Sequence, residues 1–359
     1  MQPGLSPIAP LLQNADFTEI LIDGWQKVYV ETRGSLQDVP TPFTQESGVY
    51  DLIDAILAPL GRKADESHPI HNVRLTDGAL VNIVVPPIAR TGPTVTIRKL
   101  LDRDQLNIEK LITFGSANQA MFDFLRACVL SRLNIVVAGG TASGKTTILH
   151  ILCRWIPDHE RIVVVQTADD FRLIQPRVVV LETRPANLTG RGEITAQQLI
   201  TNATNMRPDR IVLIEAHGGE LFTMLNALST GYDGGLFSLH ATSVRDALAR
   251  MEVLASYANP ALPLLSLREQ IVSGVDIILS QERLADGGRR IMKIAEVTGM
   301  QDGVVATQDL FEFRRTGIRN NKIEGVFTAT GAIPRTLEKL QYASSAYGLE
   351  LPVSLFTPA

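Results

Sequence analysis

Residues 134–146 decide the fold of most of this chain, and they read Asn-Ile-Val-Val-Ala-Gly-Gly-Thr-Ala-Ser-Gly-Lys-Thr. The segment 139–146 satisfies the pattern G-x-x-x-x-G-K-[ST] without adjustment. An apolar run typical of a buried strand precedes it at 135–138, and a run with helical spacing follows at 145–155. Glycines let such a loop turn its backbone N–H groups inward, and the following helix presents its positive end to the same anion. The alternative, a plain glycine-rich turn, does not account for this strand and helix.

The loop predicts a binding site for ATP and Mg²⁺. Lys145 is expected to reach the β- and γ-phosphates, and Thr146 to place its hydroxyl on the metal ion. The rest of the expected nucleotide-binding set consists of Gly140, Thr141, Ala142, Ser143, Gly144 and Thr147.

A second acidic element is expected near the γ-phosphate, because Mg²⁺ and the attacking water need a carboxylate there. The run 210–215 is an apolar strand pattern that ends in Glu215. We expect Glu215 to hold Mg²⁺ through water, together with Thr146. The alternative is a solvated glutamate at the end of an ordinary strand.

Bulk composition predicts a compact protein of two domains. The chain has 359 residues, 45% of them apolar and 20% charged, with a formal net charge of -4. This mild acidity and the absence of a basic run argue against a chain that grips nucleic acid. No stretch reads as a leader or a membrane span, so we expect a cytoplasmic location. Cys128 and Cys153 lie in apolar, helix-like segments, which favours buried free thiols over a disulfide.

The pattern along the chain predicts an N-terminal α/β domain over 1–98, a linker over 99–115 and a second domain over 116–359. The first domain is expected to hold strands at 19–22, 27–31, 79–85 and 95–97 and a helix at 49–60. In the second, strands at 134–138, 161–165 and 211–214 are separated by helical stretches, which predicts a mostly parallel sheet with helices on both faces. Shorter strand-like runs follow at 304–307 and 325–328.

Motifs in a shared order carry a family resemblance. With the phosphate loop, the chain resembles the secretion-ATPase superfamily of type II and type IV secretion, and it is most similar to the tight-adherence (Flp) pilus branch. The other matching segments are 65–67, 74–78 with Asn82, 182–185 with Asn187, 206–211, 215–220, 230–234, 238–243, 268–271 and 296–300.

The resemblance implies a homo-hexameric ring that hydrolyses ATP to power pilus assembly, pilus retraction or protein secretion. Each subunit would join a sensor-like N-terminal domain to a RecA-like ATPase domain, with ATP between the two. The implied partner is an inner-membrane platform protein, and the implied location is the inner face of the cytoplasmic membrane.

The resemblance also assigns roles to single residues. Glu215 would be the Walker B carboxylate and His240 a sensor near the γ-phosphate, so both join Lys145 as catalytic candidates. Arg74 and Arg98 are candidates for nucleotide contacts, and Arg184 is a candidate catalytic arginine. The alternatives are a structural histidine and ordinary surface cations.

Three departures from the family pattern concern charge near the phosphates. The acidic box usually reads Ile-Glu-Asp-x-x-Glu, but 165–170 reads Val-Gln-Thr-Ala-Asp-Asp, with Gln166 and Thr167 in place of two acids. A glutamine cannot accept a proton as a carboxylate does, so a base role must fall on Glu215 or be shared with Asp169 or Asp170. His217 and Leu80 each stand where the family has an arginine. We therefore expect binding to be better preserved than turnover.

Two alternative functions stay open at this point. One is a nucleotide-binding assembly subunit of the same machine with weak or no hydrolysis, which the altered acidic box and His217 favour. The other is a helicase or DNA translocase, which would need a basic channel loop that the sequence, with a pI near 5.9, does not offer.

Overall fold

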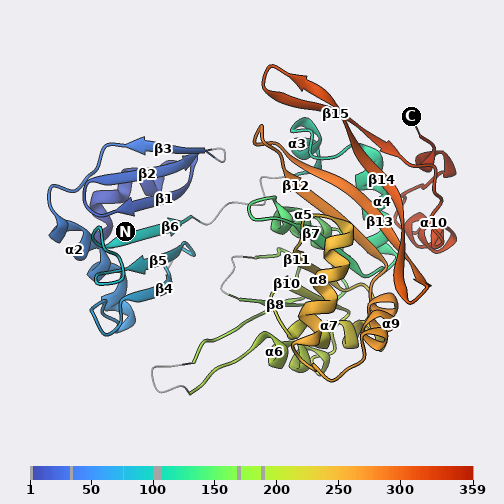
Figure 1. Cartoon of the computed structure of the whole chain (residues 1–359), viewed down its shortest axis with the longest axis horizontal. Coiled ribbons are helices and arrows are strands. Elements are labelled where there is room, and N and C mark those ends of the chain that lie inside the picture. The colour runs from blue at the N-terminus through green and yellow to red at the C-terminus, as the bar shows by residue number, and fades with distance from the viewer. Residues whose placement is uncertain are drawn as a thin grey trace. The chain divides into compact units, whose positions relative to one another are not determined.

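The computed structural model of the protein describes residues 3–32, 35–75, 77–99, 107–167, 171–186 and 191–358. The chain separates into two compact units, Met1–Asp102 and Arg103–Ala359 (Figure 1). The domain limits expected from the sequence stay a prediction. Of the expected linker, residues 100–106 lie outside the described ranges, and helix α3 (Ile108–Thr113) occupies part of the remainder.

The first unit is built on a six-stranded antiparallel sheet with the order β3-β2-β1-β6-β5-β4. Its helical elements are η1 (Pro3–Ile8), α1 (Ala9–Gln13), α2 (Glu46–Leu57) and η2 (Ala58–Leu60). The apolar side of α2 packs on buried strand residues such as Ile20 and Ile97 in one core. The strands are β1 (Phe17–Asp23), β2 (Lys27–Thr32), β3 (Ser35–Val39), β4 (Ile70–Arg74), β5 (Leu80–Val84) and β6 (Thr94–Arg98).

The four strands and the helix predicted for this unit are confirmed as β1, β2, β5, β6 and α2 with η2. Strands β3 and β4 were not predicted. They form the two edges of the sheet, and in β4 Val73 alone is buried. Edge strands bury few side chains, so their sequences lack the apolar alternation that marks a strand.

The second unit is built on a nine-stranded sheet with the order β15-β14-β13-β12-β7-β11-β10-β8-β9. The six strands from β12 to β9 run parallel to one another. Their bounds are β7 (Ile135–Gly139), β8 (Ile162–Gln166), β9 (Val178–Glu182), β10 (Arg210–Ala216), β11 (Leu236–His240) and β12 (Ile277–Arg283).

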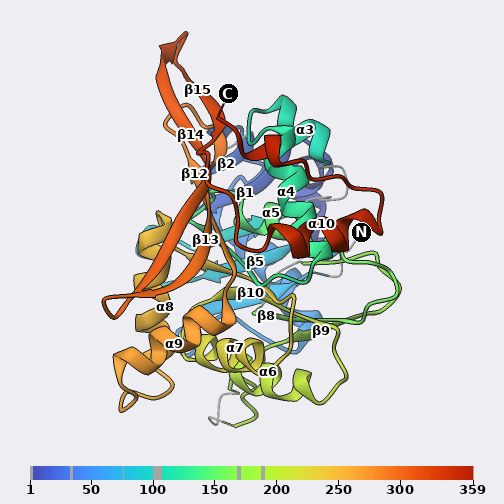
Figure 2. The same ribbon diagram turned by 90° about the vertical axis from the view of Figure 1, so that its right-hand side faces the viewer.

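Helices cover both faces of this sheet, as the sequence predicted (Figures 1 and 2). Alternate residues of β7 serve the two cores: Ile135 and Val137 face one, and Val136 and Ala138 face the other. The first core includes α4 (Gln119–Leu130), α5 (Lys145–Arg154), α10 (Leu337–Ser345) and η4 (Val353–Phe356). The second includes α6 (Ala196–Thr204), α7 (Glu220–Ser229), α8 (Val244–Ser256) and α9 (Leu264–Gly274).

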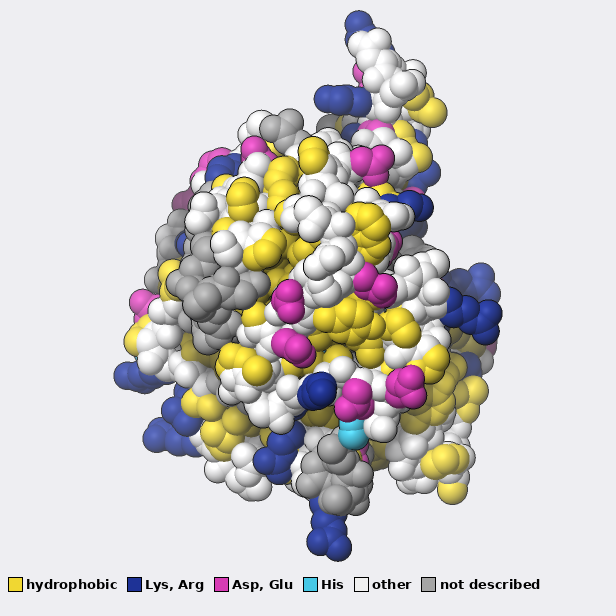
Figure 3. All heavy atoms as spheres, turned by 90° about the vertical axis from the view of Figure 1, so that its left-hand side faces the viewer, with side chains coloured by type: hydrophobic (Ala, Val, Ile, Leu, Met, Phe, Trp, Pro, Cys, Tyr) yellow, Lys and Arg dark blue, Asp and Glu magenta, His cyan; other side chains and the backbone are white. Residues whose placement is uncertain are grey.

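The prediction of a mostly parallel sheet is not confirmed as stated, because this sheet is mixed. Strands β13 (Arg289–Gln301), β14 (Val304–Arg319) and β15 (Lys322–Ala329) extend it in antiparallel pairs. The predicted runs 304–307 and 325–328 are segments of the much longer β14 and β15, whose hairpin projects from the unit (Figures 1 and 2). Ile318, near the far end of this hairpin, is exposed. Basic side chains, in dark blue, lie at the tip that projects at the top of Figure 3. Such exposed stretches carry little apolar periodicity.

Cys128 and Cys153 are buried free thiols, as predicted. Burial raises the pKa of both thiols, since an apolar interior disfavours the thiolate. Among the described residues, no helix is both long and apolar enough to cross a membrane.

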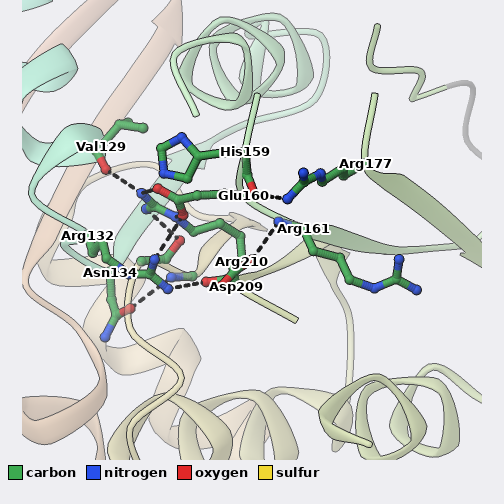
Figure 4. Close-up of polar contacts among 11 residues, drawn as sticks. Val129, Arg132, Asn134, His159, Glu160, Arg161, Arg177, Asp209 and Arg210 are labelled. Atoms are coloured by element: carbon green, nitrogen blue, oxygen red, sulfur yellow. Dashed lines mark hydrogen bonds and ion pairs between the residues drawn. The ribbon is translucent and has the colours of Figure 1, made fainter. Parts of the chain in front are cut away.

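A buried ion pair fixes the ends of the parallel strands away from the phosphate loop (Figure 4). Arg210, only 1% exposed, places its Nε 2.5 Å from Oε2 of Glu160, and Glu160 is also paired with Arg132 at 3.0 Å. The Arg210 guanidinium donates further to the carbonyl oxygens of Val129 and Gly234. These bonds join the end of α4, the entry to β8 and the loop before β11 to the first residue of β10.

We predict that Glu160→Ala strongly destabilises the protein, because it leaves the Arg210 charge buried without its partner. Breaking a buried pair in this way costs about 3–5 kcal/mol. Urea unfolding of the full chain measures the loss. Glu312→Ala is the matched control, since its partner Arg314 is largely exposed, and such pairs contribute below about 1 kcal/mol. Equal losses in the two variants would contradict the prediction.

Candidate nucleotide-binding site

The phosphate loop has the predicted strand–loop–helix context. Strand β7 ends at Gly139, and α5 begins at Lys145, so the loop backbone leads directly into the amino end of a helix. Within the loop, Ala142 has a φ of 56° and Gly144 a φ of 98°. These left-handed conformations turn the backbone sharply, and the helix end that follows offers unpaired N–H groups and a positive dipole.

Two glycines are required by close contacts as well as by backbone shape. A Cβ on Gly139 would lie 2.3 Å from Ser143 Oγ and 2.8 Å from the carbonyl oxygen of Gln281. A Cβ on Gly144 would lie 3.1 Å from Gln281 Nε2. A methyl group would therefore clash at Gly139 and press on Gln281 at Gly144, whereas Gly140 has open space around it.

Lys145 connects the loop to the predicted acidic residue. Its Nζ donates to the carbonyl oxygen of Gly140 at 3.1 Å and lies 3.4 Å from Oε1 of Glu215. Lys145 is only 7% exposed, so its ammonium group depends on these two partners. The structure thus brings together Lys145 and Glu215, the residues on which the sequence interpretation rested most.

Glu215 is held in a strained backbone conformation at the end of β10. Its φ is 60°, and the pairing of β10 with β11 shifts register between Leu213 and Ala216. A register shift of this kind redirects a side chain, as bulges beside active sites do. The N–H of Glu215 donates to Ser238 Oγ on β11 at 3.1 Å. Ser238 belongs to the family motif 238–243, but the sequence did not predict that it positions Glu215.

His240 ends β11 beside the phosphate loop. It is paired in register with Gly139, the last residue of β7, and the next N–H, that of Ala241, donates to the Gly139 carbonyl oxygen at 3.3 Å. The position next to the loop agrees with a sensor role, which remains a prediction.

The remaining loop residues fit an oxygen-rich anion and its metal ion. Ser143 is buried, and its Oγ finds no hydrogen-bond partner among the described residues. Thr146 and Thr147 lie in the first turn of α5, next to Lys145. Mg²⁺ is bound in such sites by one or two protein oxygen ligands with phosphate and water, so Thr146 and Glu215 suit it in kind.

The structure places the three candidate arginines in two regions. Arg184 donates from Nε to the carbonyl oxygen of Gly192 at 2.6 Å, and its backbone pairs with that of Ile194, so these contacts lie between β9 and α6. In the first unit, Arg74 and Arg98 both flank Leu80 in register on adjacent strands. Arg98 also pairs with Glu19 at 2.9 Å. Their nucleotide contacts stay predictions.

The altered acidic box has a structural role at Gln166. This side chain is buried, its Oε1 accepts from the N–H of Phe171 at 3.3 Å, and its Nε2 lies 3.5 Å from Oε2 of Glu182 on β9. Asp169 and Asp170, proposed to share the base role, lie outside the described residues, as does Asn187 of the family motifs. Glu215 is therefore the carboxylate observed at the loop.

His217, which the resemblance placed where the family has an arginine, is exposed just beyond β10. Its backbone N–H donates to Oε1 of Glu220 at 2.5 Å, which fixes the turn into α7. A further contact to the loop was not predicted: Arg289 on β13 donates from Nε to the carbonyl oxygen of Ala142 at 2.9 Å. No sequence motif marked Arg289, and its contact with the loop, 147 residues away in the chain, arises from strand pairing.

A strand, a glycine loop and a helix, with a buried lysine facing a carboxylate on a nearby parallel strand, define a P-loop nucleotide-binding protein. Within this class, a family model described as "Type II/IV secretion system protein" matches residues 1–320. The chain belongs to this family, as the resemblance indicated.

Curated relatives match most of the chain. A putative conjugal transfer protein of Mycobacterium tuberculosis is 31% identical over 333 residues, which cover 87% of this chain and 94% of the relative. The type IV secretion system protein PtlH of Bordetella pertussis is 32% identical over 317 residues, covering 80% and 91%.

Two solved structures support the fold. The pilus retraction motor PilT with bound ADP aligns over 99% of this chain and 92% of its own, with a TM-score of 0.55 and 16% identity. The ATPase DotB of Yersinia pseudotuberculosis aligns over 79% and 76%, with a TM-score of 0.52 and 15% identity. At these identities the likeness concerns the fold alone.

We predict that Gly144→Ala lowers nucleotide affinity about tenfold, since an L-residue in this left-handed conformation costs about 1–2 kcal/mol. The added methyl group would also press on Gln281 Nε2. Fluorescence titration with a labelled ADP measures the affinity. Gly317→Ala is the control, because its Cβ would meet nothing within 4 Å. Affinity unchanged in Gly144→Ala would show that the loop adapts to a side chain.

Proposed function

We propose that this protein is an ATP-hydrolysing motor that powers pilus assembly, pilus retraction or type II/IV protein secretion. The observation that carries the proposal is the position of Lys145, held between the Gly140 carbonyl oxygen and the Glu215 carboxylate. Family membership supports the same function. The proposed second domain is RecA-like, and the proposed first domain acts as a nucleotide sensor.

The residues of the loop have distinct roles in this proposal. Inward N–H groups and the amino end of α5 bind the phosphates, and a phosphate oxygen competes with the Gly140 carbonyl oxygen and the Glu215 carboxylate for the Lys145 ammonium group. Glu215, freed from part of its ion pair, orients the attacking water and accepts its proton. When bound through Thr146 and Glu215, Mg²⁺ supplies charge neutralisation of the phosphates. His240 senses the γ-phosphate, while Arg74, Arg98 and Arg184 supply further positive charge.

The assembly belongs to the proposal as well. Six copies form a ring in the cytoplasm at the inner face of the cytoplasmic membrane and act on an inner-membrane platform protein of a pilus or secretion machine. Placement within the Flp pilus branch is part of the proposal too, and no nucleic acid is expected as a partner.

A second candidate function is a nucleotide-binding assembly subunit with weak or no hydrolysis. Gln166 favours it, because this amide fills the acidic-box position and accepts the N–H of Phe171. An amide in that role can orient water but cannot take up a proton.

Steady-state hydrolysis of Mg²⁺-ATP separates the two functions. We expect turnover by the wild type, loss of both binding and turnover in Lys145→Ala, and retained binding in Glu215→Gln with turnover reduced about 10²-fold or more. Arg250→Ala, an exposed residue on α8 paired with Asp246, is the control. If the wild type binds ATP without measurable turnover, the subunit function replaces the motor.

Ring formation is tested by sedimentation velocity with ATP and Mg²⁺. We expect a hexamer at high protein concentration, as the resemblance to the secretion-ATPase superfamily implies. A monomer under these conditions would remove the main support for a motor.

A further inference from the structure

The hairpin formed by β12 and β13 contacts the phosphate loop from the side opposite Glu215. Strand β12 pairs with β7 on one edge, while β11 and then β10 lie on the other. Arg289, the first residue of β13, donates to the carbonyl oxygen of Ala142, and its Cδ lies 3.2 Å from the Cβ position of Gly144. The side chain of Arg289 therefore lies along the loop.

This contact acts on a loop residue with a left-handed backbone conformation. Ala142 has a φ of 56°, a conformation that an alanine seldom adopts without help from its surroundings. A guanidinium bond to its carbonyl oxygen directs that oxygen toward β13 and stabilises the turn.

Gln281 on β12 supplies the second contact. It is 4% exposed, paired in register with Gly139, and its Nε2 lies 3.1 Å from the Cβ position of Gly144. Its Oε1 is buried and has no hydrogen-bond partner among the described residues. A buried amide oxygen without a donor is destabilising, and native proteins retain such groups mainly where they serve a function.

We propose that Gln281 and Arg289 are positioning residues of the nucleotide site, which hold the phosphate loop in its binding conformation. Arg289 fixes Ala142 through its carbonyl oxygen. Gln281 supports Gly139 and Gly144, and its unpartnered oxygen accepts a backbone N–H of the loop once the loop has closed on a bound phosphate. The inference rests on the proposed function, since it assigns two further residues to the same site.

Arg289 is tested by titration of the full-length protein with a labelled ADP. We expect Arg289→Ala and Arg289→Lys both to weaken binding about tenfold, because lysine keeps the charge but loses the planar Nε–H donor. In hydrolysis assays KM rises in these variants and kcat changes little. The control Arg250→Ala keeps the wild-type affinity. Wild-type affinity in Arg289→Lys would overturn the positioning role.

Gln281→Met tests the second residue, because it should lower the affinity for nucleotide without lowering the stability of the protein. Methionine has a similar volume and no unpartnered oxygen, so resistance to urea should be equal to or higher than that of the wild type. Affinity for the labelled ADP should fall about fivefold or more. A residue with only a structural role would lose stability instead, and that result would overturn the inference.

The experiment distinguishes failure of this inference from failure of the proposed function. If the wild type binds no labelled ADP, both are overturned together. If the wild type binds it and the Arg289 and Gln281 variants bind it equally well, only the assignment of these two residues is overturned.

Discussion

The ammonium group of Lys145 is the group on which the arrangement of the second unit depends. A buried cation needs compensating partners, and its partners here are the Gly140 carbonyl oxygen, just past β7, and the Glu215 carboxylate on β10. Strand β11 lies between these two strands, so the pair forms across it. Because β7, β11 and β10 run parallel, their carboxyl ends meet at the same edge of the sheet, and this brings the two partners within reach of Lys145. The ion pair between Lys145 and Glu215 therefore depends on this order of strands.

Local sequence patterns predicted the parts of the site that are themselves local. The segment 139–146 specifies its own turn, and the apolar run 210–215 specifies a strand with an acid at its end. Ser238, Gln281 and Arg289 could not be found in this way, because neutral and basic residues on strands are common, and their contacts arise from strand order. Gln281 meets Gly139 only because β12 pairs with β7. The mixed sheet escaped prediction for a related reason, since much of β14 is exposed and shows little apolar alternation.

The altered acidic box shows how a family position can be kept for packing after its chemistry has changed. Gln166 lies on β8, directly beside β10, with its side chain buried and bonded to the N–H of Phe171. A glutamate there would carry a charge that this buried environment must compensate, whereas an amide satisfies the same N–H without charge. If residue 166 is the family's acidic position, as the resemblance implies, the amide keeps the local backbone contact without carrying a charge. Hydrolysis would then rely on Glu215, whose bulged backbone and bond to Ser238 already direct it toward Lys145.

The phosphate loop is supported from two sides by different kinds of interaction. Toward β10 the support is electrostatic, through Lys145 and Glu215, and a bound phosphate must compete with it. Toward β12 and β13, the uncharged residue Gln281 packs against the loop, and the Arg289 guanidinium donates one hydrogen bond to the Ala142 carbonyl oxygen. Since β13 continues into the antiparallel pairs with β14 and β15, the second support connects the loop to the part of the sheet that lacks the parallel pattern. A ligand can displace Lys145 from Glu215 and leave the contacts to β12 intact. It would then change only the contacts between the loop and β10. Binding would then act first on β10 and on the turn into α7 that follows it.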